Sequence, residues 1–143
     1  MTRKSKVLVA VLLALTMMAV LAFKFAAVRR AQSRSCASKM KAIGLAGRLW
    51  ANDRADMMPT NFTCMSNELI IPKILHCSAD SERPQVDTWQ KFTEESSSYE
   101  IVSPGAPEGT TNIAFMRCRI HGHLGFTDGS VMNASRTKVL PKY

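Results

Sequence analysis

The chain has 143 residues and a formal net charge of +8, and this charge is unevenly distributed. Residues 1–54 hold eleven Lys and Arg against one acid, whereas residues 55–143 hold eight Lys and Arg against ten acids. The basic residues flank an apolar segment, where Lys and Arg set membrane topology. Residues 55–143 lack a basic patch interleaved with aromatics, so the composition argues against nucleic-acid binding.

The N-terminal segment predicts a membrane anchor. Residues 7–23 form an apolar run without a charge, and a helix over residues 7–28 is about 33 Å long, enough to cross a bilayer core. Residues 1–6 then form a basic cytoplasmic N-terminus in front of a single transmembrane helix that contacts membrane lipids. The alternative is a secretory signal peptide that is cleaved after Ala22.

Residues 29–53 predict an amphipathic continuation of the same helix. Met40, Ile43, Gly47 and Trp50 recur at steps of three and four residues and therefore share one helix face. We expect this packing face to lie against the C-terminal domain. Small residues such as Gly44 and Gly47 also allow a second interpretation, in which another helix approaches closely, as in a filament.

Residues 54–132 predict a small α+β domain, and residues 133–143 predict a polar tail. The domain is expected to contain a capped helical turn at residues 66–71 that Pro72 closes, a polar loop over residues 81–97 with at most one helical turn around residues 89–92, and an exposed loop over residues 104–109. A C-terminal β-hairpin is expected, with Asp128 and Gly129 in a type I′ turn. Strands are expected at residues 73–77, 98–102 and 112–118.

Several motifs follow one another in order over about two thirds of the chain. They are Cys36-Ala37-Ser38-Lys39-Met40-Lys41-Ala42-Ile43-Gly44-Leu45-Ala46, then Leu49-Trp50-Ala51-Asn52-Asp53 and Pro59, then Ser66-Asn67-Glu68-Leu69, then Pro72-Lys73-Ile74-Leu75-His76-Cys77-Ser78-Ala79-Asp80, then Cys118-Arg119-Ile120-His121-Gly122-His123, and last Asp128-Gly129-Ser130-Val131. The ordered set resembles the pseudopilin-like proteins with a prepilin-type N-terminal methylation domain, as in planctomycete and verrucomicrobial bacteria. The prepilin cleavage signature of that family, a Gly before a Phe and an early Glu, is missing from residues 6–12.

The resemblance implies an α+β, pilin-like fold in which a long N-terminal α-helix packs on a small antiparallel β-sheet domain. It also implies a non-enzymatic structural subunit of a type II secretion or type IV pilus-like assembly. Such a subunit crosses the inner (cytoplasmic) membrane once, has its C-terminal domain in the periplasm or outside, and contacts other pilin-like subunits or secretion-system proteins. The alternative function is an exported periplasmic binding module, released after its signal peptide, that carries a Zn site.

The four cysteines predict either disulfides or a metal site. Cys77 and Cys118 end two expected strands and form the preferred disulfide, while Cys36 and Cys64 pair with each other or stay free. The metal alternative uses the ligands His76, Cys77, Cys118, His121 and His123. The Cys-x-x-His spacing suits zinc, but adjacent residues of a strand point to opposite faces, which argues against His76 and Cys77 binding together.

Other chemistry has weaker support in the sequence. The acidic residues Asp80, Glu82 and Asp87 offer oxygen ligands for Ca²⁺, although a solvated loop explains them as well. Neither a nucleophile nor a pair of carboxylates accompanies the histidines, so no catalytic residues, no enzyme activity and no cofactor are expected.

Overall fold

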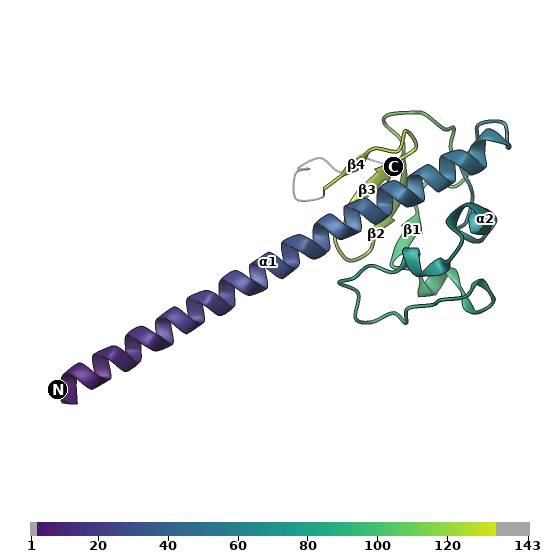
Figure 1. Ribbon diagram of the computed structural model, residues 1–143. Coiled ribbons are helices and arrows are strands. Elements are labelled where there is room, and N and C mark those ends of the chain that lie inside the picture. Colours follow the sequence, from purple (N-terminus) through teal and green to yellow (C-terminus); the bar gives the residue numbers. More distant parts are fainter. Residues whose placement is uncertain (1–2, 134–143) are drawn as a thin grey trace. The chain divides into compact units, whose positions relative to one another are not determined.

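The structure is a computed structural model that describes residues 3–133, so residues 134–143 of the expected polar tail lie outside the described residues. Its elements are helix α1 (Arg3–Asn52), a series of short helices, and four strands (Figure 1). The chain divides into two compact units, residues 1–32 and residues 33–143, and α1 contributes to both.

The first unit is the N-terminal part of α1. Every side chain from Val7 to Val28 is exposed, and the segment is long and apolar enough to cross a membrane, a property that signal sequences share. The hydroxyl of Thr16 donates a hydrogen bond of 2.8 Å to the carbonyl of Leu13. Residues 7–23 therefore present no unsatisfied hydroxyl to a lipid environment, where one would be costly.

In the second unit, the C-terminal part of α1 packs on the sheet through one face. Cys36, Met40 and Ile43 are fully buried in the main core, and Trp50 is half-buried at its edge. Leu45 and Leu49 lie on the opposite face and are exposed. The buried face follows the three- and four-residue spacing of the sequence, because these steps return to the same side of a helix.

Gly44 and Gly47 of α1 lie against the chain's own domain. A Cβ atom at Gly47 would stand 2.9 Å from Cε of Met58 and 3.3 Å from Cε1 of Phe115, whereas one at Gly44 would stand 3.6 Å from Cε of Met116. The small residues thus let α1 approach the sheet. The interpretation that Gly44 and Gly47 receive another helix is wrong, because the domain already occupies this face.

The sheet is an antiparallel meander of four strands in the order β1-β2-β3-β4 (Figure 1). It was expected from the sequence at residues 98–102, 112–118 and 123–132. A long N-terminal apolar helix packed on a four-stranded antiparallel sheet is an α+β, pilin-like architecture, as predicted. The strand bounds are β1 (Tyr99–Ile101), β2 (Ala114–Cys118), β3 (Leu124–Phe126) and β4 (Val131–Met132).

A bulge in β2 determines how the sheet meets α1. The register with β3 shifts between Ala114 and Met116, so Phe115 is the extra residue. Consecutive strand residues normally point to opposite faces, but a bulge changes this alternation. As a result Phe115 and Met116 both enter the main core, and each comes within contact distance of a glycine position of α1.

The segment between α1 and the sheet contains no strand at residues 73–77, and this prediction is wrong. Pro72 instead begins a 3₁₀ helix. The fixed φ of proline suits the first turn of a helix, and proline lacks the N–H group that would have no partner there. The short helices are η1 (Thr63–Met65), α2 (Ser66–Leu69), η2 (Pro72–Leu75), η3 (Trp89–Lys91) and η4 (Glu94–Ser96). The helical turn at Ser66 is present, but no side chain caps it.

Two turns also differ from their predictions. The amide of Gly129 donates to the carbonyl of Phe126, the amide of Phe126 donates to the carbonyl of Ser130, and of the pair Asp128-Gly129 only Gly129 has a positive φ. This is a three-residue hairpin loop with a glycine bulge and not a type I′ turn, which needs positive φ at two residues. The loop over residues 104–109 is only partly exposed, since Ala106 is buried.

Ile70 adopts a strained backbone conformation, with φ +61° and ψ −57°, which β-branched residues rarely adopt. Its side chain is 76% exposed, so it contributes little packing. We expect Ile70→Gly to raise the free energy of unfolding by about 1 kcal/mol through relief of this strain. Urea unfolding of the full chain in detergent, followed by tryptophan fluorescence, measures the change.

The matched control is Ile71→Gly, because Ile71 is also exposed but has an extended backbone with φ −129°. There glycine only adds freedom to the unfolded chain, and stability should fall by about 0.5–1 kcal/mol. Equal effects of the two substitutions would contradict the assignment of strain to Ile70.

Candidate metal centre

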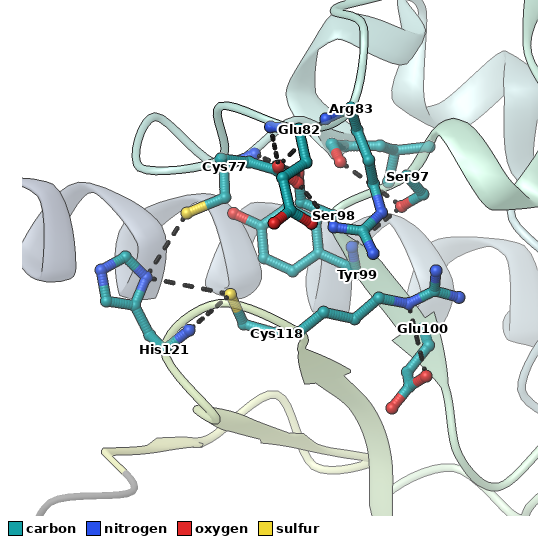
Figure 2. Close-up of polar contacts among 12 residues, drawn as sticks. Cys77, Glu82, Arg83, Ser97, Ser98, Tyr99, Glu100, Cys118 and His121 are labelled. Carbon is teal, nitrogen blue, oxygen red and sulfur yellow. Dashed lines mark hydrogen bonds and ion pairs between the residues drawn. The ribbon is translucent and has the colours of Figure 1, made fainter.

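Three cysteines and one histidine meet inside the second unit. The ligand atoms of Cys36, Cys77, Cys118 and His121 all lie within 4.8 Å of one another. The three cysteines are buried and the histidine is half-buried. Figure 2 shows the imidazole of His121 facing the sulfurs of Cys77 and Cys118, with Nδ1 at 3.4 Å from the first and 3.9 Å from the second.

Each group reaches the centre from a different part of the fold. Cys36 is carried by α1, Cys77 lies just after η2, Cys118 ends β2, and His121 belongs to the loop between β2 and β3. The four groups therefore come together only when the helix, the intervening segment and the sheet have packed.

The loop after Cys118 is shaped to return His121 toward the sulfur. The amide of Gly122 donates to the carbonyl of Cys118 at 2.8 Å, and Gly122 has a φ of +66°, which favours glycine. The amide of His121 also points to the sulfur of Cys118, at 3.4 Å. This tight turn places a thiol and an imidazole three residues apart on the same side of the chain.

Further hydrogen bonds hold the groups around the cluster in place. The hydroxyl of Tyr99 donates to Sγ of Cys36 at 3.6 Å, and burial raises the pKa of Tyr99, so the phenol keeps its proton. The amide of Cys77 donates to Oγ of Ser98 at 2.9 Å, and that hydroxyl donates to the buried carboxylate of Asp80 at 2.7 Å. Ser98 and Asp80 thus hold the backbone of Cys77 in place.

The pKa values of the three thiols shift in different directions. Hydrogen bonds from Cys118 and Cys36 hold the pKa of Cys77 far below its usual range, despite its burial. The same bonds, first to Cys118 and then to Cys77, raise the pKa of Cys36, and burial adds to the rise. For Cys118 the bond with Cys36 lowers the pKa, but the bond with Cys77 and burial prevail and raise it. Of the three sulfurs, only that of Cys77 is therefore favoured as a thiolate by its neighbours, whereas Cys36 and Cys118 hold their protons.

The structure brings together only part of the predicted metal set. Cys77, Cys118 and His121 meet, but His123 stacks on His121 and places Nε2 3.0 Å from Oγ of Ser33. His76 is also outside the cluster, and its buried Nδ1 has no hydrogen-bond partner. The expectation that His76 and Cys77 would not bind together agrees with this arrangement, although the reason differs, because residues 73–77 form no strand.

Cys36 is the member of the cluster that the metal prediction omitted. The sequence predicts that Cys36 pairs with Cys64 or stays free. The helical spacing of the sequence could have placed it. Cys36 precedes Met40 by four residues and Ile43 by seven, so it lies on the same buried helix face. All four cysteines are free thiols in the structure, and Cys64 is exposed outside the cluster. The Cys77–Cys118 disulfide stays a prediction.

Within residues 3–133 no other group of three or more ligand side chains gathers in this way. Both oxygens of Asp80 accept hydrogen bonds, and Asp87 forms an exposed ion pair with Lys73 at 3.7 Å. Asp128 accepts the amide of Ser130 at 2.8 Å in the hairpin turn. These contacts give Asp80 and Asp128 structural roles.

Comparison of the chain with protein-family models, with curated proteins and with solved structures finds no match. The fold and the centre therefore define the class by themselves: an α+β, pilin-like architecture that has an apolar N-terminal helix and encloses a Cys₃His cluster.

Proposed function

We propose that the protein is a membrane-anchored, non-enzymatic structural subunit of a pilin-like assembly, of the type II secretion or type IV pilus kind. The observation that carries the proposal is the continuous helix α1, which is apolar and exposed at residues 7–28 and packs on the sheet at residues 36–51. A soluble domain would not leave such a surface in contact with water, because exposed apolar patches of this size mark interaction sites.

Basic residues flank both ends of the anchor, since Arg3, Lys4 and Lys6 precede the apolar run and Arg29, Arg30 and Arg34 follow it, so charge alone sets no orientation. All four cysteines lie after the apolar run, and cysteine-containing domains suit an oxidising compartment. This supports an anchor with the N-terminus in the cytoplasm. Residues 33–133 then face the periplasm, where partners of the same pilin-like class or secretion-system proteins would contact the exposed face of α1 that includes Leu45 and Leu49.

Membrane fractionation with intact-mass measurement tests the anchor. We expect the full-length chain in the membrane pellet after carbonate washing, because burial of one apolar helix is effectively irreversible. A variant without residues 2–28 should appear in the soluble fraction. A soluble wild-type product that begins near Phe23 would instead support the alternative function, an exported binding module released from its signal peptide.

Cys64 provides a test of orientation, because it is the exposed cysteine among the four. A maleimide that cannot cross membranes should label wild-type protein in intact spheroplasts and should not label Cys64→Ser. Labelling that occurs only after the membrane is broken would place the domain in the cytoplasm and contradict the proposed topology.

A further inference from the structure

We propose that Cys36, Cys77, Cys118 and His121 bind one zinc ion through three thiolates and one imidazole. The inference goes beyond the proposed role of the chain as a membrane-anchored subunit and does not depend on it. It assigns a structural metal to the second unit, at the place where α1 meets the sheet.

The positions of the ligand atoms match a tetrahedral zinc site. Zn–S bonds of about 2.3 Å and Zn–N bonds of about 2.0 Å separate sulfur and nitrogen ligands by about 3.5 Å in a tetrahedron. Nδ1 of His121 lies 3.4 Å from Sγ of Cys77 and 3.9 Å from Sγ of Cys118, on either side of that separation. Since all four ligand atoms lie within 4.8 Å of one another, small side-chain rotations suffice to complete the site.

The ligand types select zinc. Ca²⁺ and Mg²⁺ require oxygen ligands, and the cluster holds three thiols and an imidazole without a carboxylate. Four protein ligands also leave no open position for water or substrate, which is typical of structural zinc sites. The site would therefore stabilise the fold without taking part in catalysis.

Hydrogen-bond donors reach two of the sulfurs, as metal-bound thiolates require. Three thiolates and Zn²⁺ carry a net charge of −1, which requires nearby donors when it is buried. The Tyr99 hydroxyl and the His121 amide supply such donors to the sulfurs of Cys36 and Cys118. In a Cys77–Cys118 disulfide these two sulfurs would bond to each other, and the buried Cys36 thiol and His121 would then have no metal to bind.

Zinc at this position would join segments that are far apart in the sequence. The ligands span residues 36 to 121 and come from α1, the segment after η2, and the β2–β3 region. In small domains the binding energy of a structural metal contributes directly to folding. Removal of zinc should therefore loosen the contact between residues 33–52 and the sheet.

The first test is the zinc content of the full chain, purified in detergent without reductants or chelators and measured by elemental analysis. We expect one zinc ion per chain, and Cys36→Ser and His121→Ala should lose it. Cys64→Ser and His76→Gln are matched controls that should keep it, because neither residue belongs to the cluster. Zinc-free wild type, with a mass two hydrogens lower before reduction, would overturn the proposal in favour of a disulfide.

A second measurement covers the case in which the ligand variants fail to fold. Wild-type chain exchanged with Co²⁺ should show the intense visible bands of tetrahedral cobalt and the charge-transfer band of cobalt bound to thiolates. The spectrum should be the same for Cys64→Ser. Weak bands typical of six-coordinate cobalt would mean that the metal is bound elsewhere and would overturn the assignment.

Discussion

Gly47→Leu is expected to lower the free energy of unfolding by about 3 kcal/mol, because it overpacks the contact between α1 and the sheet. Even the first added carbon would stand 2.9 Å from Met58 and 3.3 Å from Phe115. The methionine can rotate away, but the Phe115 ring is fully buried and has little room to move. Urea unfolding of the full chain in detergent, monitored by the fluorescence of Trp50 and Trp89, measures the loss.

Gly44→Ala is the matched control for this prediction. Its Cβ would make ordinary contacts at 3.6 and 3.7 Å, and alanine favours a helix over glycine by about 1 kcal/mol. The two substitutions on one helix should therefore change stability in opposite directions. A stabilising Gly47→Leu would mean that α1 does not approach the sheet as closely as the structure shows.

Asp80→Asn is expected to destabilise the second unit by about 2 kcal/mol, because a buried carboxylate with several donors becomes a neutral amide. Its oxygens accept hydrogen bonds from the Ser98 hydroxyl at 2.7 Å, the Arg83 guanidinium at 3.1 Å and the amides of Glu82 and Arg83. Burial alone would raise the pKa of Asp80, but these bonds lower it from 3.8 to about 2. The matched control, Asp87→Asn, removes only an exposed ion pair and should change stability by less than about 0.5 kcal/mol.

The sign of the pH dependence follows from the lowered pKa of Asp80. The ionised carboxylate binds its proton more weakly in the folded state, so its stabilisation is complete above the unfolded pKa near 3.8. This stabilisation is lost as the pH falls through the folded pKa of about 2. The stability difference between wild type and Asp80→Asn should therefore shrink over this interval, as unfolding at a series of pH values would reveal. A difference that is constant from pH 5 to pH 2 would contradict the lowered pKa.

Local patterns in the sequence were sufficient for the helix and the sheet. The apolar run and the spacing of Met40 and Ile43 predicted one continuous helix, and α1 ends at Asn52, as expected. Alternating apolar residues predicted β1 and β2, and the pair Asp128-Gly129 predicted a hairpin. These features depend on the positions of side chains along one element, which the order of residues determines.

Tertiary structure decided the elements whose local signals were ambiguous. Residues 73–77 are apolar enough for a strand, but Pro72 starts a 3₁₀ helix there, and Leu75 and Cys77 fill the core from it. The hairpin turn took its three-residue form because Phe126, the last residue of β3, pairs with Ser130, which directly precedes β4. The β2 bulge, which turns both Phe115 and Met116 toward α1, had no marker in the sequence.

The predicted metal set contained three of the four members of the candidate metal centre, Cys77, Cys118 and His121, and omitted Cys36. The spacing of Cys118 and His121 is local, so the sequence alone determined that thiol–imidazole pair and the helical face that carries Cys36. Which cysteines join them depends on contacts across 41 residues from Cys36 to Cys77 and a further 41 to Cys118. Only the packing of α1 on the sheet decided this, because residues so far apart meet when the helix, the η2 segment and the β2–β3 turn share one core.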